Sequence, residues 1–238
     1  MAPNAGTPLA IAHRGDPHGH RENTVPAVLA ALDQGADLVE IDLALTRDGT
    51  AVLLHDETLT RLWGRALAVA DTDITEIRAV RSGCGRYEIP EFDQVLRLLA
   101  GSGTGLMVDV RAPAAAEAAG EIVEKHGEFD RTVFAGDLGS LLAVRRRWRQ
   151  ARIALSWYVP QRPSPGLLEV LRPEFYNPHW PLLSRPVIDD MHERGLRVST
   201  WTVDHPPTMA QLLGIGVDAV ITNRLSRFLA VRAVHQAR

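Results

Sequence analysis

Short apolar runs alternate with helical patterns along the whole chain, and this alternation limits the possible folds more than any other feature. Eight runs of strand length occupy residues 9–12, 38–43, 106–110, 132–135, 153–157, 174–177, 197–203 and 218–222. Most are followed by helical patterns, at 24–35, 114–126, 137–148, 166–171, 184–194, 206–213 and 225–235. Strand–helix alternation at this spacing favours a parallel sheet, and eight repeats favour a sheet closed into a barrel.

The second repeat departs from the regular pattern. Asp48-Gly49 is a tight-turn signal, and the apolar residues 51–54 follow it directly, so a hairpin is expected here. A weakly patterned segment of about 57–88 comes next, before Pro90 opens another helix. The predicted fold is therefore α/β, a TIM-type (βα)8 barrel with a β-hairpin excursion and a small insertion after the second barrel strand. We expect residues 1–238 to form one domain.

Composition agrees with a barrel enzyme and argues against some partners. The chain has 238 residues, close to the usual size of an eight-stranded α/β barrel, and 45% of them are hydrophobic. Its net charge of −3 argues against nucleic acid or an anionic membrane as the main partner. Cys84 is the only cysteine, so a disulfide within the chain is impossible. The oligomeric state stays open.

Two kinds of targeting segment are not found in the sequence. The N-terminus MAPNAGTPLAIAHRG lacks a basic region followed by an apolar run long enough for secretion. No stretch reaches the roughly 18 apolar residues of a membrane span, so stable membrane insertion is not expected. A cytoplasmic location is the resulting expectation.

Reactive side chains stand at the ends of the first strands, where barrel enzymes build their sites. His13 follows the apolar run 9–12, and His55 follows the run 52–54. Glu40 and Asp42 are two residues apart on one strand, so the strand's period of two places both on the same face.

Two carboxylates that point together into a barrel repel each other. A shared proton or a bound cation relieves this repulsion, and hard divalent ions prefer oxygen ligands. The pair Glu40 and Asp42 therefore suggests half of a metal site, and the two histidines beside it could act as general base and general acid. The alternative is that each histidine is an ordinary core or loop residue, which the ordering of the whole set along one segment disfavours.

Later strand ends supply further candidates. Asp109 and Arg111 are again two apart, so Asp109 could complete a three-ligand site and Arg111 could bind an anionic group on the metal. An Asp–Arg pair that closes the barrel end is an equally good interpretation. Trp201, expected on the same face as Val203, either forms a wall of the substrate pocket or is a core tryptophan.

With these residues in view, the chain resembles the glycerophosphodiester phosphodiesterase family, of the short bacterial type. The family's opening pattern stands here as His13-Arg14-Gly15, Glu22-Asn23-Thr24, Glu40-Ile41-Asp42 and His55-Asp56, with TRDGT before the last pair. The later segments EIPEFDQVLRLL, WTVD and GVDAVITN also match. The similarity covers nearly the whole chain, and its first four motifs are highly specific in order and spacing.

The resemblance implies a role for each matching residue. It implies metal ligation by Glu40 and Asp42, acid–base catalysis by His13 and His55, and phosphate contact by Arg14. The family's third ligand usually comes from E-x-K, where this chain has Asp109-Val110-Arg111. Aspartate is one methylene shorter than glutamate, and the guanidinium of arginine is a planar fork whereas the ammonium of lysine is a point charge. The two replacements therefore bear on substrate preference. Related barrel phospholipases of the D-type toxin group also use aspartate there.

The function implied is metal-dependent hydrolysis of small glycerophosphodiesters to glycerol 3-phosphate and an alcohol, with one Mg²⁺ or Ca²⁺, or else Mn²⁺. Two alternatives remain. A sphingomyelinase D-type lipid phosphodiesterase would need an apolar surface for acyl chains, and a non-catalytic phosphodiester-binding barrel would normally have lost a histidine or a ligand. Arg21 stands where the family commonly has proline, and we interpret it, with His18 and His20, as a solvated loop residue.

Overall fold

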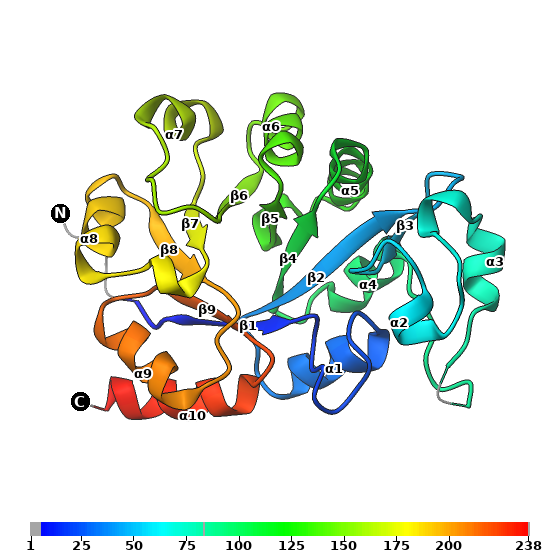
Figure 1. The fold of residues 1–238 in the computed structure, drawn as a ribbon, viewed down its shortest axis with the longest axis horizontal. Coiled ribbons are helices and arrows are strands. Elements are labelled where there is room, and N and C mark those ends of the chain that lie inside the picture. The colour runs from blue at the N-terminus through cyan, green and yellow to red at the C-terminus, as the bar shows by residue number, and fades with distance from the viewer. Residues whose placement is uncertain (1–5, 83, 238) are drawn as a thin grey trace.

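Eight parallel strands form the centre of the protein (Figure 1), seen in a computed structural model that describes residues 6–82 and 84–237. They are Leu9–His13 (β1), Leu38–Leu45 (β2), Gly105–Val110 (β4), Thr132–Gly136 (β5), Arg152–Trp157 (β6), Phe175–Pro178 (β7), Arg197–Thr200 (β8) and Ala219–Thr222 (β9). Neighbouring strands pair in parallel, and β1 pairs with both β2 and β9, so the sheet closes on itself. The predicted TIM-type barrel is confirmed.

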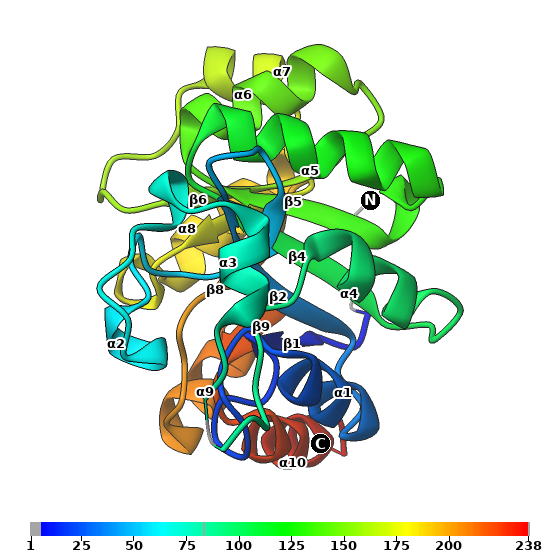
Figure 2. The ribbon, with the colours of Figure 1, turned by 90° about the vertical axis from the view of Figure 1, so that its right-hand side faces the viewer.

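Helices surround the strands (Figure 2). They are Val25–Asp33 (α1), Phe92–Leu99 (α4), Pro113–His126 (α5), Leu138–Arg147 (α6), Pro165–Leu171 (α7), Arg185–Glu193 (α8), Pro206–Gly214 (α9) and Leu225–Gln236 (α10), with short 3-10 turns at Phe129–Arg131 (η2) and Trp180–Leu182 (η3). Helix α1 begins after Thr24 with a proline in its first turn, a position where the missing N–H costs nothing. Within the described residues, no helix combines the length and apolarity needed to span a membrane.

The hairpin excursion is also confirmed. Ala51–Leu53 (β3) returns antiparallel to β2, and an insertion follows it with the short elements Thr60–Trp63 (α2), Val69–Asp71 (η1) and Ile74–Ala79 (α3). Figure 1 shows α2 and α3 at the side of the molecule opposite α8. The insertion has an apolar core of its own, formed by Val52, Leu54, Leu59, Trp63, Val69, Ile74, Ile77, Val80 and Ile89. Its helices are too short for a clear period, which explains the weak sequence pattern.

The barrel strands separate their side chains into two layers. On β2, Val39, Ile41 and Leu43 belong to the large core between the sheet and the helices, whereas Leu38 belongs to the smaller core inside the barrel. Glu40 shares the inward face with Leu38, since alternate residues of a strand point to the same side. The strand period therefore turns the carboxylates of β2 into the barrel.

The eighth run ends earlier than predicted. Strand β8 ends at Thr200, and the next residues leave the regular strand. Trp201 packs against the inner core, whereas Val203 is buried in the outer core. The expectation that Trp201 and Val203 share a face is wrong, because the strand period does not continue through Trp201.

Gly15 occupies a position where the backbone tolerates no side chain. Its φ is +82°, and an added Cβ would lie 2.5 Å from the carbonyl carbon of Ala27 in α1. The turn after His13 therefore touches the backbone of α1, and only glycine permits this approach.

Gly15→Ala is expected to destabilise the protein more than a matched glycine replacement. Gly35 has a similar φ of +86°, and no atom of the described part of the chain lies within 4 Å of an added Cβ, so Gly35→Ala should cost only the left-handed backbone penalty, about 1–2 kcal/mol. Gly15→Ala adds an overlap worth about 1–3 kcal/mol more. Chemical denaturation of both variants measures the difference. Equal free energies of unfolding would mean that α1 moves away at little cost.

Candidate functional site

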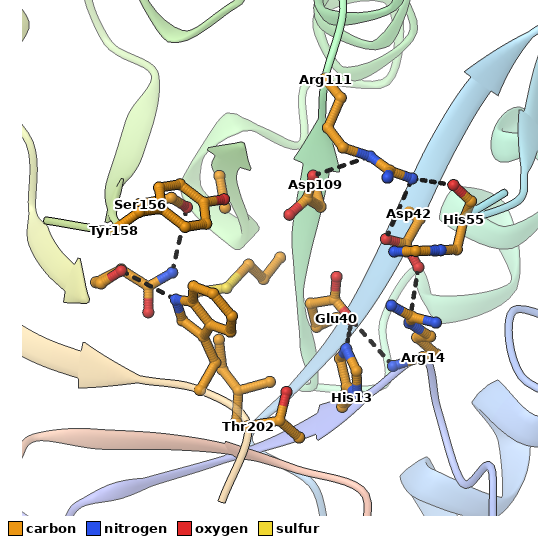
Figure 3. A pocket seen from close by; sticks show the side chains of 15 residues that line it. His13, Arg14, Glu40, Asp42, His55, Asp109, Arg111, Ser156, Tyr158 and Thr202 are labelled. Carbon is orange, nitrogen blue, oxygen red and sulfur yellow. Dashed lines mark hydrogen bonds and ion pairs between the residues drawn. The ribbon is translucent and has the colours of Figure 1, made fainter. Parts of the chain in front are cut away.

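A cavity of about 270 Å³ opens at the carboxyl ends of the barrel strands (Figure 3). Its lining residues are His13, Arg14, Glu40, Asp42, His55, Met107, Asp109, Arg111, Ala135, Ser156, Tyr158, Asn177, Trp201, Thr202 and Ile221. All eight residues that the sequence analysis selected are among them. This end of a TIM barrel is where active sites are found.

Three carboxylates converge on one side of the cavity. Asp42 and Asp109 are direct neighbours in the register between β2 and β4, and Glu40 lies one inward position earlier on β2. One oxygen from each residue lies within 4.8 Å of the other two. Burial and the charges of Asp42 and Asp109 raise the pKa of Glu40 well above its usual value. Burial, with the charge of Asp42, raises the pKa of Asp109 to about 6.

The chemistry of this acidic cluster fits a divalent cation. Oδ1 of Asp109 is buried and accepts no hydrogen bond from any residue that the structure describes, which is costly for an ionised carboxylate. A hard cation offers such an oxygen a partner and removes the repulsion that raises the pKa values. Glu40, Asp42 and Asp109 are therefore the residues that could hold a metal ion.

Arg14 lies against the acidic cluster in an unusual backbone conformation. Its φ is +59°, and its N–H donates to Oε2 of Glu40 at 3.0 Å while its Nε lies 3.0 Å from Oδ2 of Asp42. Asn23, with φ +56°, donates from Nδ2 to the same oxygen of Asp42 at 2.7 Å. Arg14 and Asn23 are thus two residues other than glycine with a left-handed backbone at one site, which indicates backbone strain. The contacts with Glu40 and Asp42 hold this strained backbone in place.

His13 is held in one tautomer by an amide. Its Nδ1 lies 2.7 Å from Oδ1 of Asn223, whose own Nδ2 donates to Oδ2 of Asp204 at 2.8 Å. Since Oδ1 of the amide only accepts, Nδ1 of His13 carries the hydrogen. Its Nε2 is then unprotonated in the neutral ring, 3.9 Å from Oε2 of Glu40. Burial, together with the charge of Arg14, lowers the pKa of His13.

His55 has a charged partner instead. Its Nδ1 donates to Oδ1 of Asp56 at 2.8 Å, which again leaves Nε2 as the free ring nitrogen. A hydrogen bond from Arg61 is the main reason that the pKa of Asp56 is lowered to about 2, so this carboxylate stays ionised at neutral pH. The two histidines therefore differ in what orients them, a neutral amide for His13 and a carboxylate for His55.

Arg111 extends across the mouth of the cavity. Its Nη2 lies 3.9 Å from Oδ1 of Asp42 and contacts the backbone carbonyl of His55, and its Nε lies 4.0 Å from Oδ1 of Asp109. Its side chain is 43% exposed. The guanidinium thus lies 3.9–4.0 Å from the acidic cluster, and its hydrogen bond goes to the carbonyl of His55.

Aromatic side chains line the opposite side of the cavity (Figure 3). The ring of Trp201 lies 5.4 Å from that of Tyr158 in an edge-on arrangement and 5.1 Å from that of His179. Nε1 of Trp201 donates to the carbonyl of Asn177 at 3.1 Å, which fixes the ring. Trp201 lines the cavity and also packs against the inner core, so its role as a wall of the substrate pocket stays a prediction.

Several residues around the site were not selected from the sequence. Asn23 contacts Asp42, Asn223 and Asp204 orient His13, and Asp56 and Arg61 lie behind His55. Their positions after strands or beside the recognised motifs were the available signal. Arg21 was assigned wrongly as a solvated residue: its guanidinium lies 5.1 Å from the ring centre of Trp63 and 5.7 Å from that of Tyr87, so it stacks on the insertion.

Comparison with known proteins agrees with this architecture. A glycerophosphodiester phosphodiesterase of Caldanaerobacter subterraneus is 28% identical over 90% of this chain and 93% of its own length. The structure of a phosphodiesterase from Oleispira antarctica superposes with a TM-score of 0.85 at 24% identity, covering 94% of this chain and 96% of that one. A glycerophosphodiester phosphodiesterase structure from Parabacteroides distasonis gives 0.84 at 21% identity, with 98% and 100% covered.

A sequence profile gives the family directly. The profile of the glycerophosphoryl diester phosphodiesterase family matches residues 13–227, which begins at His13 and includes every residue of the site described above. This is far more than half of the chain, and it agrees with the barrel, the hairpin and the order of the motifs. The chain belongs to the glycerophosphoryl diester phosphodiesterase family.

Proposed function

We propose that this protein is a metal-dependent phosphodiesterase that hydrolyses small glycerophosphodiesters to glycerol 3-phosphate and an alcohol. The main support is that one cavity brings together two histidines, three carboxylates and two arginines. The two histidines have different hydrogen-bond partners, an amide for His13 and a carboxylate for His55. Family membership supports the substrate class. The structure of the Oleispira antarctica phosphodiesterase, which shares the fold, is in complex with the product sn-glycerol-3-phosphate.

Glu40, Asp42 and Asp109 are proposed to hold one divalent cation, Mg²⁺ or Ca²⁺ or else Mn²⁺. A bound cation polarises the phosphoryl oxygens and stabilises negative charge that develops on them. Arg14 and Arg111 are proposed to bind the same oxygens from the protein side, because guanidinium groups match the geometry of phosphate. Trp201 is proposed to form the wall against which the organic part of the substrate lies.

The two histidines are proposed to divide the proton transfers. His13, neutral and with Nε2 free, accepts the proton of the attacking hydroxyl, which in a glycerophosphodiester is the neighbouring glycerol hydroxyl. His55 as imidazolium donates a proton to the departing alcohol oxygen, because the ionised Asp56 stabilises its positive charge. The P–O bond to the alcohol breaks as the cyclic phosphate forms, and water then opens the ring with the histidine roles reversed.

The test is direct incubation with defined diesters. Glycerophosphocholine and glycerophosphoethanolamine are supplied with Mg²⁺, Mn²⁺ or Ca²⁺, and released glycerol 3-phosphate is measured. Release supports the proposal. Turnover restricted to lysophosphatidylcholine would support the lipid phosphodiesterase alternative, and binding of diesters without turnover under any of these metals would support the non-catalytic one.

Metal binding is expected to weaken as the pH falls from 7.5 to 5.5. A raised pKa means that a carboxyl keeps its proton to higher pH, so protons compete with the cation where Asp109, with a pKa of about 6, and Glu40 titrate. The affinity should fall on the order of tenfold per pH unit for each proton displaced. Calorimetric titration in two buffers of different ionisation enthalpy counts those protons. Equal affinity at both pH values, with no proton release, would contradict the proposed ligand set.

A further inference from the structure

Arg61 in α2 lies outside the cavity lining but touches two carboxylates that orient site residues. Its Nε donates to Oδ2 of Asp56 at 2.6 Å and its Nη2 to Oδ1 of the same residue at 3.0 Å. Its Nη1 and Nη2 donate to Oε2 and Oε1 of Glu22 at 3.2 and 2.7 Å. A single guanidinium thus binds two carboxylates, each through both of its oxygens.

Each of these carboxylates holds a different residue of the site. Asp56 accepts from Nδ1 of His55 at 2.8 Å. Glu22 accepts from Nη1 of Arg14 at 2.8 Å, and Nε of Arg14 lies 3.0 Å from Asp42. The result is a chain of alternating charge from Asp42 through Arg14, Glu22, Arg61 and Asp56 to His55. Arg61 is the residue that connects the part of this chain around Arg14 to the part around His55.

The insertion holds Arg61 in this position. Trp63, two residues later on α2, is 6% exposed in the core of the insertion. The guanidinium of Arg21, the residue before Glu22, stacks on the ring of Trp63 at 5.1 Å. Helix α2 is therefore fixed to the loop that carries Glu22 by two separate contacts, the Arg21–Trp63 stacking and the hydrogen bonds of Arg61.

We propose that Arg61 is a positioning residue that sets the orientation of both His55 and Arg14, so that the insertion controls the proton donor and the phosphate-binding arginine together. The inference rests on the proposed function for its kinetic readout. A guanidinium is required because its planar fork donates two hydrogen bonds to each of the two carboxylates. The ammonium of lysine is a point charge that cannot form these paired hydrogen bonds.

The experiment compares Arg61→Ala and Arg61→Lys with Arg47→Ala. Arg47 is a matched control because it makes a similar paired contact with Asp73 near the same insertion and touches no site residue. Both Arg61 variants are expected to lose about 10–100-fold in kcat on glycerophosphocholine and to show a raised KM. Arg47→Ala should stay within about twofold of the wild type. Added guanidinium ion should restore part of the kcat of Arg61→Ala but not raise that of Arg47→Ala.

Double variants distinguish orientation from general damage. If Arg61 acts through Asp56, Arg61→Ala combined with Asp56→Asn should lose little more kcat than the worse single variant, because residues in one network are not additive. The proposal would be overturned if the kcat of the double variant fell by the product of the two single-variant losses. It would also be overturned if Arg61→Ala had the kinetics of the wild type. Melting temperatures of the Arg61 and Arg47 variants show whether a loss comes from unfolding, and in that case Arg61→Lys carries the test.

A magnetic resonance measurement separates this proposal from the proposed function. In nitrogen-15 spectra of the wild type, the neutral form of His55 should carry its hydrogen on Nδ1, and Arg61→Ala should alter that signal while Arg47→Ala leaves it unchanged. This holds even for a protein that hydrolyses none of the diesters. An unaltered His55 signal in Arg61→Ala would overturn the positioning role, whatever the activity.

Discussion

The His55→Ala variant is expected to lose about 10²–10⁴-fold in kcat, the usual contribution of a positioned acid or base. In the proposed mechanism its imidazolium supplies the proton without which the alcohol must depart as an alkoxide. KM should change much less, because Arg14, Arg111 and the metal site still bind the phosphate. A substrate whose leaving group is a phenol of low pKa should be affected far less than glycerophosphocholine, since such a group departs without a proton.

The matched control for this replacement is His126→Ala. His126 in α5 makes the same kind of contact, with its Nε2 2.8 Å from Oδ1 of Asp93, but lies away from the cavity. It should keep near-normal kcat with at most a modest loss of stability. Near-normal turnover of His55→Ala on glycerophosphocholine would show that another group protonates the alcohol and that the hairpin is only structural.

Glu40→Gln is expected to lower activity on the order of 10³-fold or more, because it removes one ligand of the proposed cation, whose charge stabilisation is worth several kcal/mol. Chelation of the wild-type protein should cause a comparable loss that added divalent ion reverses. The shape of the side chain is kept, so the fold should remain. Without metal the variant should be as stable as the wild type or more stable, because burial disfavours the ionised form of Glu40.

Glu174→Gln serves as the control for charge alone. Glu174 precedes β7 at the other end of the barrel and pairs with Arg152 at 2.7 Å. The Glu174→Gln variant should have a slightly lower free energy of unfolding and unchanged metal affinity and kcat. Calorimetric titration with Mg²⁺ and Mn²⁺ measures the affinity for each variant. Unaltered metal affinity together with full activity in Glu40→Gln would remove Glu40 from the ligand set.

The repeating pattern of the sequence was enough to predict the barrel. Local periodicity determines which segments become strands and helices, and a strand's period of two determines that Glu40 and Asp42 share the inward face. The hairpin followed from Asp48-Gly49 for the same local reason. Predictions of this kind fail where the period is interrupted, as at Trp201, or where elements are as short as α2.

The partners of the site residues could not be predicted in this way. His13 and Asn223 are 210 positions apart and meet because β1 pairs with β9 when the barrel closes. Arg61 reaches Glu22 across 39 positions only because the insertion folds back onto the loop before α1. Neither contact can be predicted from the periodicity of apolar residues in the sequence.

The sequence by itself determined the barrel, the inward face of the carboxylates and the residue types available at the strand ends. Tertiary structure alone decided that His13 is oriented by an amide and His55 by a carboxylate, and that Arg61 connects His55 to Arg14. The physical reason is that local backbone geometry specifies faces and turns, whereas hydrogen-bond partners depend on which distant strand ends and loops meet when the sheet closes and the insertion docks.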